Sequence, residues 1–370
     1  MTKNKKQAWY YDIREDFEKY PKAWCYLVWS RRGPGKTYST LRYMHEENRR
    51  FCFLKRTVDD VKLLCAGSKP TGDSTKDIDL SPFKPLNRDF GWDVHINPIY
   101  DGLAAFYDYY PENGTLVPGK LEGYCIALSK AIKYKGFDLS ECDYMILDEF
   151  IPRAWERVSK NECDQILDLY ETISRDRVKR GREELKFIGL ANATDIANPL
   201  FLGLEVMDIA AEMDATDTEY CYLEERGILL HYINHEGTDT DEEQPLTGIQ
   251  KAMIGTAWAE MAFGGHFAYN DFTQIGKSKL KGHKCIYSLL YKHKEYFIYK
   301  NVVNANTVYY VSLVRGIPGK TYDLNRESQQ KLFWINNGRT LYNATIDDRV
   351  IFQTYSAYDL ITNYRRYFDL

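Results

Sequence analysis

The sequence has no long apolar run, no closely spaced cysteine pairs and no internal repeat. Its 370 residues contain no stretch of about 18 apolar residues, the length that a helix needs to cross a bilayer. Its eight cysteines are scattered without a C-x-x-C pair, which favours reduced thiols over a zinc site or a disulfide framework. The basic N-terminus leads into Trp9-Tyr10-Tyr11-Asp12, which is unlike a secretory signal peptide.

The composition is that of a folded chain whose charge is unevenly distributed. With 44% hydrophobic and 28% charged residues, it is not a wholly disordered protein, and its length suggests two domains. The net charge of −4 hides 13 acids against one base in residues 205–244, and 15 bases against 7 acids in residues 274–370. The acidic stretch ends in residues 237–245, which lack apolar periodicity. We therefore expect a first domain over 1–204, an acidic linker or lid region over 205–245, and a basic domain over 246–370.

Short apolar runs alternate with helical patterns in the first domain, which predicts an α/β fold with a mainly parallel sheet. The expected strands are 24–29, 50–54, 123–128, 144–147 and 185–190, and the expected helices are 37–48, 58–64 and 162–173. The basic domain differs, with three consecutive strand patterns at 285–290, 296–303 and 307–314 and a helix near 326–334. This order predicts an antiparallel meander in a smaller α+β domain.

A phosphate-binding loop is predicted where the first strand meets the first helix. The residues are Ser30-Arg31-Arg32-Gly33-Pro34-Gly35-Lys36-Thr37, which match G-x-x-x-x-G-K-[ST] except at Ser30. Glycines let backbone N–H groups surround a polyphosphate, and the helix N-terminus adds partial positive charge. Lys36 is suited to the β- and γ-phosphates of ATP, and the hydroxyl of Thr37 to Mg²⁺.

A second Gly-Lys-Thr, at residues 319–321, shows that the triplet alone has little meaning. Pro-Gly-Lys is also a simple exposed turn, and we predict a turn for this copy. Only the first copy is followed by an apolar strand that ends in two acids, Asp148 and Glu149. Such acids are costly at the end of a buried strand unless they face a cavity or a cation.

Three polar side chains at predicted strand ends complete the expected ATP site. Asp148 is the candidate ligand of Mg²⁺ together with Thr37, and Glu149 is the candidate that activates water. Asn192 follows the apolar strand 185–190, and in a parallel sheet its side chain belongs at the same edge. It is the candidate sensor of the γ-phosphate, with an ordinary turn as the alternative.

Two basic segments are each compatible with more than one role. Residues 172–182 include Arg175 and Arg177, which suit an arginine supplied to a neighbour's phosphate, a contact with DNA phosphates, or a solvated face. Near the C-terminus, lysines alternate with tyrosines, a composition that suits a nucleic-acid backbone, although a solvated sheet face is the alternative. The candidate nucleic-acid residues are Lys277, Lys279, Lys281, Lys284, Lys292, Lys294 and Lys300.

Taken together, these motifs resemble the DNA-packaging (encapsidation) ATPases of Picovirinae-type bacteriophages, which are P-loop ATPases of the ASCE group related to terminase large subunits. The resemblance rests on Ile-Leu-Asp-Glu-Phe-Ile (146–151), Thr-Ile-Ser-Arg (172–175), residues 189–201, and the basic strand end 53–57. It implies a homopentameric ring that uses ATP and Mg²⁺ to pump double-stranded DNA through the portal of a procapsid. It also implies that Arg175, or else Arg177, acts on the ATP site of a neighbouring subunit, and that a structural prohead RNA is a partner. The expected location is the cytoplasm of the infected cell, and no membrane partner is expected.

Related terminases end in an RNase H-like nuclease, which needs several carboxylates around two metal ions. The C-terminal strands here carry few acids, and Asp271, Asp323, Asp347 and Asp348 form no clear cluster. We therefore expect a vestigial nuclease-like domain that binds nucleic acid. The alternatives are a terminase that still cuts DNA, and a nucleic-acid-binding or capsid-assembly protein that does not hydrolyse ATP.

Overall fold

The computed structural model describes residues 11–31, 33–67, 78–134, 136–153, 156, 158–159, 161–233, 248–256, 267 and 270–369. The chain divides into two units. The first unit comprises residues 1–204 and 212–269, and the second comprises residues 205–211 and 270–370. None of the helices in the described ranges is long and apolar enough to span a membrane.

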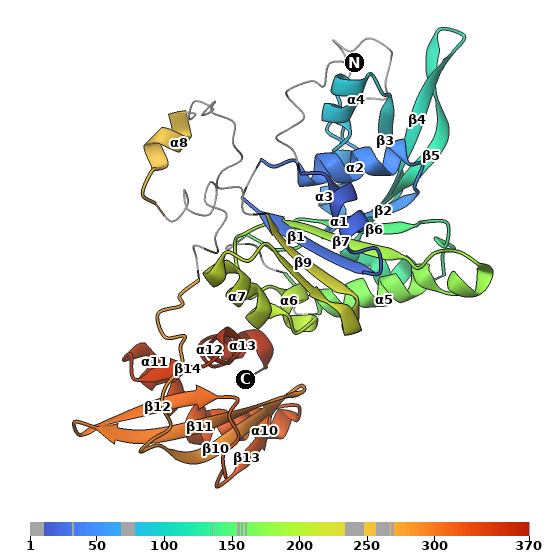
Figure 1. Ribbon diagram of the computed structural model, residues 1–370. Helices are drawn as coiled ribbons and strands as arrows, with labels where there is room; N and C mark the ends of the chain where they lie inside the picture. The colour runs from blue at the N-terminus through green and yellow to red at the C-terminus, as the bar shows by residue number, and fades with distance from the viewer. Residues whose placement is uncertain are drawn as a thin grey trace. The chain divides into compact units, whose positions relative to one another are not determined.

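The first unit is built on a nine-stranded sheet in the order β3-β4-β5-β2-β6-β7-β1-β9-β8 (Figure 1). The six strands from β5 to β9 in this order are parallel, and β3, β4 and β8 add antiparallel edges. The strands are β1 (Cys25–Ser30), β2 (Phe51–Lys55), β3 (Val94–Tyr100), β4 (Leu103–Glu112), β5 (Thr115–Ala127), β6 (Tyr144–Asp148), β7 (Lys186–Asn192), β8 (Tyr220–Leu223) and β9 (Ile228–Ile233).

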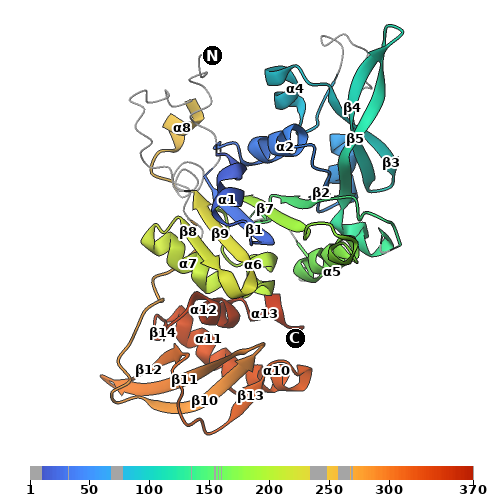
Figure 2. The same ribbon diagram turned by 45° about the vertical axis from the view of Figure 1, so that its right-hand side comes forward.

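Helices cover both faces of this sheet, and the core forms between them and the strands. The helices that precede the division at residue 204 are α1 (Ile13–Lys19), α2 (Lys36–Glu46), α3 (Val58–Leu64), α4 (Lys84–Phe90), α5 (Glu162–Ser174) and α6 (Pro199–Gly203). Residues of α7 (Met207–Thr216) belong to both units, and α8 (Gly248–Met253) belongs to the first unit. Short 3-10 turns occur at Leu128–Tyr134, Val178–Arg180 and Glu224–Arg226. Apolar side chains of α1, α2, α3 and α4 pack on one face of the strands, and α5 and α6 lie on the other (Figure 2). The central strands β1, β2 and β6 are buried on both sides, so they read as continuous apolar runs.

The predicted parallel α/β sheet is confirmed, and it is larger than the sequence pattern indicates. All five predicted strands and three predicted helices are present, with ends shifted by a few residues except for β5, which begins at Thr115. The β3–β4–β5 meander was not predicted, and its β4–β5 hairpin extends beyond the other strands (Figure 1).

The prediction of a linker over 205–245 is wrong for its first part. Residues 220–233 form β8 and β9, and β9 pairs with β1 along its whole length, so this stretch completes the sheet. The physical reason is the fully buried run Ile228–Ile233, whose apolar character outweighs the acids before it. The end of the expected linker, residues 237–245, lies outside the described residues.

The second unit has a five-stranded sheet in the order β13-β10-β11-β12-β14. The predicted antiparallel meander is confirmed as β10 (Lys284–Tyr291), β11 (Lys294–Val303) and β12 (Asn306–Ser312), to which β13 (Thr321–Asp323) and β14 (Val350–Phe352) add in parallel. The helices are α10 (Glu327–Phe333), α11 (Arg339–Ile346), α12 (Tyr355–Thr362) and α13 (Tyr364–Tyr367), with a π-helical turn at Trp334–Gly338. They bury an aromatic core against one face of the sheet.

The second Gly-Lys-Thr lies in this unit and does not open a helix. Its Thr321 begins the short strand β13, where it pairs with Ser288 of β10. The N–H of Gly319 donates to the carbonyl of Ile286, and the ammonium of Lys320 lies 4.5 Å from the ring centre of Tyr322. The backbone N–H groups of this copy therefore do not converge at a helix N-terminus.

Candidate functional site

The loop between β1 and α2 has the backbone shape that its sequence predicts. Gly33 and Gly35 have φ values of 105° and 82°, in the left-handed region where a side chain would be strained. Gly35 is the N-cap of α2, so the N–H groups of the loop lie at a helix N-terminus, which favours an anion. Arg31 and Pro34 are part of this loop, and Arg32 lies outside the described residues.

Lys36 is buried at the start of α2, and its hydrogen bonds to the described residues all go to neutral oxygen atoms. Its side-chain nitrogen donates to the hydroxyl of Ser30 (2.5 Å), the carbonyl of Arg31 (3.3 Å) and the amide oxygen of Asn192 (3.4 Å). Burial lowers the pKa of Lys36 to about 7, although Asp148 opposes the shift. A buried ammonium without a direct carboxylate partner fits a site that receives an anion. Ser30, which replaces the first glycine of the pattern, supplies the shortest of these contacts.

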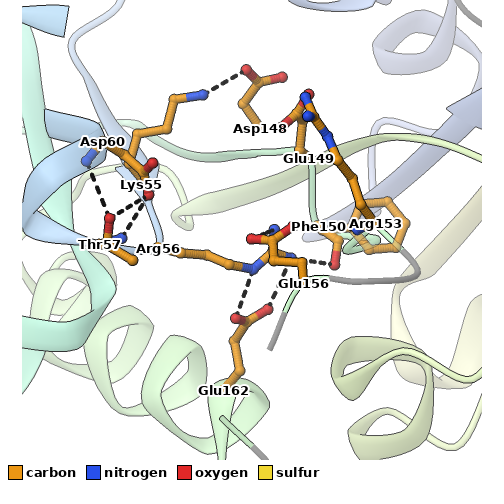
Figure 3. A network of polar contacts seen from close by, with 10 residues as sticks. All are labelled: Lys55, Arg56, Thr57, Asp60, Asp148, Glu149, Phe150, Arg153, Glu156 and Glu162. Carbon is orange, nitrogen blue, oxygen red and sulfur yellow. Dashed lines mark hydrogen bonds and ion pairs between the residues drawn. The ribbon is translucent and has the colours of Figure 1, made fainter. Parts of the chain in front are cut away.

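The carboxylate of Asp148 joins the loop to the neighbouring strands. Thr37 Oγ1 donates to its Oδ1 at 2.9 Å. Lys55 Nζ donates to its Oδ2 at 3.0 Å, a contact that Figure 3 shows. Burial disfavours the charge of Lys55, but Asp148 outweighs it and raises the pKa of Lys55. A carboxylate beside a hydroxyl is a suitable ligand pair for Mg²⁺, and Lys55 supplies positive charge to that carboxylate here.

Glu149 follows in an unusual backbone conformation. Its φ is 62°, which is uncommon for a residue other than glycine, and it turns the chain directly after Asp148. The N–H of Phe150 then donates to the carbonyl of Leu190 at 3.1 Å. The carboxylate of Glu149 is half-exposed and lies 3.8 Å from the guanidinium of Arg153 (Figure 3). An exposed contact of this length contributes little, so Glu149 is held loosely.

Asn192 lies where the sequence places it, at the carboxyl end of β7. This strand lies between β1 and β6, and Asn192 is the register partner of Ser30. The edge of the sheet therefore brings together Ser30, Lys36, Thr37, Asp148 and Asn192. These residues come from three neighbouring parallel strands and from the helix that follows one of them.

Arg56 connects the carboxyl edge of the sheet to the start of α5, and the sequence pattern does not predict this role. Its guanidinium donates to the carbonyl of Phe150 (2.9 Å) and to both carboxylate oxygens of Glu162 (2.9 and 3.2 Å) (Figure 3). Glu162 is buried at the first residue of α5, and burial raises its pKa despite the arginine. The only signal in the sequence is the pair Lys55-Arg56 at the end of an apolar strand. Arg56 thus connects the turn after Glu149 to the start of α5.

The far end of α5 carries Arg175, which is exposed at the C-cap. The helix has 13 residues and is therefore about 20 Å long. The loop that follows contacts Ser140, Cys142 and Asp143, just before the first residue of β6. Arg175 therefore lies at the amino edge of the sheet, whereas Lys36 and Asp148 lie at the carboxyl edge.

Arg177, the second candidate for an arginine that acts on a neighbour, does not fit that role. Its side chain is 1% exposed, and its guanidinium donates to the carbonyls of Ser140 (2.6 Å), Cys142 (2.5 Å) and Glu183 (3.2 Å) and to Asp143 (2.8 Å). These contacts use four of the five N–H donors of the guanidinium and involve all three of its nitrogens. The prediction fails because Arg177 anchors its own loop to the sheet.

The seven candidate lysines of the second unit do not form one surface. Lys284 and Lys300 are register partners at one end of the β10–β11 pair, whereas Lys292 and Lys294 lie at the hairpin end, about 25 Å away for a strand of eight residues. Lys294 pairs with Asp208 at 2.7 Å, so it is not a free cation. Lys292 is exposed in the turn.

Three of the four tyrosines between these lysines are buried, which corrects the prediction of a basic and aromatic surface. Tyr287 and Tyr296 belong to the core under the helices, and Tyr299 packs with Phe297 and Tyr310 on the opposite face. In a strand, alternate side chains point to opposite faces, and both faces of β11 are covered here. Their aromatic rings are therefore not available for stacking with bases.

A smaller basic surface remains at one end of the second unit. Gly316 approaches Cys285 and Tyr299 so closely that a Cβ there would lie 2.8 and 2.6 Å from them, which places Arg315 beside Lys284. We define the basic end surface as the exposed Lys284, Lys300 and Arg315, together with the exposed Lys277, Lys279 and Lys281 of the segment that leads into β10. In the described part of the chain, none of the six makes an ion pair, whereas Lys331, Arg326 and Arg349 do.

The comparison with known proteins agrees with this geometry. The profile of the podovirus DNA encapsidation protein (Gp16) family matches residues 113–342, well over half of the chain. The DNA packaging protein of Bacillus phage B103 is 30% identical over 179 residues, which are 48% of this chain and 50% of that protein. The matched stretch thus spans about half the length of such relatives.

Two solved structures resemble the chain along nearly its whole length. The phi-29 viral genome packaging motor assembly matches with a TM-score of 0.63 and 17% identity, covering 97% of this chain and 99% of that one. The phi-28 gp11 DNA packaging motor matches with a TM-score of 0.60 and 17% identity, covering 98% of each chain. At this identity, both likenesses establish the fold.

The contacts of Arg56 predict the effect of two substitutions. Arg56→Met leaves the buried Glu162 carboxylate unpaired and should lower the free energy of unfolding by about 3 kcal/mol in urea titrations. The double substitution Arg56→Met with Glu162→Met removes the unpaired charge and should recover most of the loss. If the double variant is as unstable as the single one, the stability does not depend on this ion pair.

Proposed function

This chain belongs to the podovirus DNA encapsidation protein (Gp16) family, and we propose that it is an ATP-driven motor that moves double-stranded viral DNA into a preformed capsid through the portal vertex. The observation that carries the proposal is the gathering of Lys36, Thr37, Asp148 and Asn192 at one sheet edge. A relative that matches part of this chain is named a DNA packaging protein. The proposed place of action is the host cytoplasm, transiently on the procapsid.

The residues at the sheet edge have distinct roles in the proposed ATP hydrolysis. Residues 30–37 surround the phosphates of ATP, and the ammonium of Lys36 leaves its neutral partners to bind the β- and γ-phosphates. Thr37 and Asp148 would hold Mg²⁺, which supplies positive charge to the phosphate oxygens when bound. Asn192 orients the γ-phosphate or the attacking water.

Glu149 is the proposed base that orients and deprotonates the attacking water. Its carboxylate has only the loose contact with Arg153, so moving it toward the phosphate costs little. Because Arg56 holds the carbonyl of Phe150, the backbone next to Glu149 stays in place while its side chain moves. This arrangement lets one residue respond to the nucleotide without disturbing the core.

Arg175 is the proposed arginine that acts on the ATP of a neighbouring subunit. It lies at the opposite edge of the sheet from its own phosphate loop, so it cannot reach its own nucleotide. A head-to-tail contact in which the amino edge of one subunit faces the carboxyl edge of the next closes into a ring. We propose a homopentamer, in keeping with the family resemblance.

The basic end surface is the proposed contact with nucleic acid in the second unit. Six exposed cations that make no ion pair with any described carboxylate give a positive local field, which attracts a phosphodiester backbone. Duplex DNA is the proposed cargo, and the portal of the procapsid and a structural prohead RNA are further proposed partners.

The proposal also holds that the second unit is nuclease-like in fold and no longer cuts DNA. Asp271 accepts hydrogen bonds from Thr273 and has a lowered pKa because of them, and Asp323 contacts Asn325 and Arg326. Within the described ranges, no three metal-ligating side chains come together. These contacts favour turn-capping roles over a terminase with two catalytic metals.

The proposed motor is tested by steady-state ATP hydrolysis with and without duplex DNA. The wild type should show turnover that DNA stimulates, and Lys36→Ala should lower it by at least about 100-fold because the phosphates lose their main cation. Turnover that survives in Lys36→Ala would contradict the assignment of this loop. Tight ATP binding without turnover, with DNA and procapsid present, would favour the non-hydrolysing alternative.

If Arg175 acts on the ATP of a neighbouring subunit, its substitution should lower ATP turnover without weakening ATP binding. Arg175→Ala should reduce turnover by about 1,000-fold, as for other arginines supplied in trans, and leave the Kd for ATP within about twofold of wild type. Titrating the variant into wild-type rings should reduce activity more than in proportion. Arg180→Ala, in the same exposed loop, is the matched control and should be nearly neutral. A large loss of ATP affinity in Arg175→Ala would overturn the trans role.

The basic end surface predicts a change in salt dependence. The triple substitution Lys284→Ala, Lys300→Ala and Arg315→Ala should weaken the binding of duplex DNA. It should also make the negative slope of log association constant against log salt concentration shallower by about 3. Lys331→Ala, which removes an ammonium already paired with Glu327, should leave the slope unchanged. Equal slopes for the triple variant and the wild type would place the DNA contact elsewhere.

A further inference from the structure

Three ionisable side chains are buried in contact with one another next to the phosphate loop, and none has a role in the proposed hydrolysis of ATP. Tyr11, Asp16 and His231 are 6%, 0% and 2% exposed. The hydroxyl of Tyr11 donates to Asp16 Oδ2 at 2.6 Å, and His231 Nδ1 lies 2.9 Å from the same oxygen. These residues belong to the segment before α1, to α1 itself and to β9.

This cluster is polar where its surroundings are mainly aromatic and apolar. The ring of Tyr220 stacks on His231 with centres 4.1 Å apart, and His231 Nε2 lies 3.6 Å from Glu219. Burial disfavours the charged form of His231, but the contacts with Asp16 and Glu219 outweigh it and raise its pKa. Burial is the main cause that raises the pKa of Tyr11. A carboxylate this deep is tolerated only because both neighbours are bound to it.

The same segment holds the phosphate loop through its backbone. The N–H of Tyr11 donates to the carbonyl of Pro34 at 2.8 Å, and the N–H of Ile13 donates to Ser39 Oγ in α2 at 3.0 Å. On the other side, His231 is the register partner of Val28 in β1, the strand that enters the loop. Figure 2 shows α1 against the part of the sheet that β1 and β9 form.

We propose that Tyr11, Asp16 and His231 form a positioning cluster that fixes the phosphate loop in the shape that binds nucleotide. Asp16 accepts hydrogen bonds from both partners and so fixes residues 11–13 on β9. Residues 11–13 in turn hold Pro34 and Ser39, on the two sides of Lys36. None of the three touches the nucleotide. The inference rests on the proposed binding of ATP at this loop.

The test compares Tyr11→Phe with a matched control in the second unit. Tyr367 also donates to a buried aspartate, Asp359, so Tyr367→Phe removes the same kind of hydrogen bond far along the chain. Equilibrium binding of a fluorescent ATP analogue should weaken by roughly fivefold or more in Tyr11→Phe. In Tyr367→Phe the Kd should stay within about twofold, while thermal unfolding records a comparable loss of stability in both.

A pH series gives a second readout that a purely structural role would not alter. The groups that face His231 are Tyr11, Asp16, Glu219 and Tyr220. Because the folded-state pKa of His231 is raised, its ion pair is complete below pH about 6.5 and is lost as the pH rises through the raised value. The wild type should therefore bind more tightly than His231→Gln at pH 6, and the two affinities should converge at higher pH. The titration of Lys36 is common to both proteins and cancels in their ratio.

The outcomes separate this inference from the proposed function. If the wild type binds no nucleotide, ATP binding at the loop is wrong. If the wild type binds nucleotide and Tyr11→Phe binds equally well, the positioning cluster is wrong. A ratio of wild-type to His231→Gln affinity that does not change with pH also contradicts it.

Discussion

The ammonium of Lys36, buried among neutral oxygens, is the interaction on which the rest of the site depends. A charge enclosed in this way is costly, and the surrounding chain reduces the cost with Ser30, Arg31 and Asn192 but leaves it without a direct carboxylate. In the proposed function, the phosphates of ATP would supply negative charge to this ammonium. The lowered pKa of Lys36 has the same cause, because burial disfavours the charged ammonium relative to the neutral amine.

The second constraint is the connection between the two edges of the sheet. Arg56 ties the turn after Glu149 to the first residue of α5, and Arg177 ties the loop after α5 to the chain before β6. The helix between these two anchors is about 20 Å long. Both ends of α5 are therefore anchored to the sheet, one beside the turn at Glu149 and the other beside Arg175. In a ring, that connection would link the nucleotide of one subunit to that of the next.

The local patterns of the sequence predict most of the site, and contacts between distant residues explain what they do not predict. The Gly-Lys-Thr loop, the strand ending in Asp148 and Glu149, and Asn192 are each visible because strand and helix signals are local. Arg177 is one base in a basic run, and only the fold shows that carbonyls of Ser140 and Cys142 bind it. The apolar run Ile228–Ile233 is itself a strand signal, but the acidic residues around it led to the prediction of a linker. Likewise, the period-2 alternation of Tyr296 and Ile298 indicates a core face rather than a basic surface.

The most direct test of the central claim is DNA packaging itself, measured as DNA that procapsids protect from nuclease after incubation with this protein. The account predicts that wild-type protein with ATP and Mg²⁺ protects genome-length duplex DNA, and that Glu149→Gln or a non-hydrolysable ATP analogue gives none. Protection of full-length DNA by Glu149→Gln, or without hydrolysis of ATP, would contradict an ATP-driven motor built on this site.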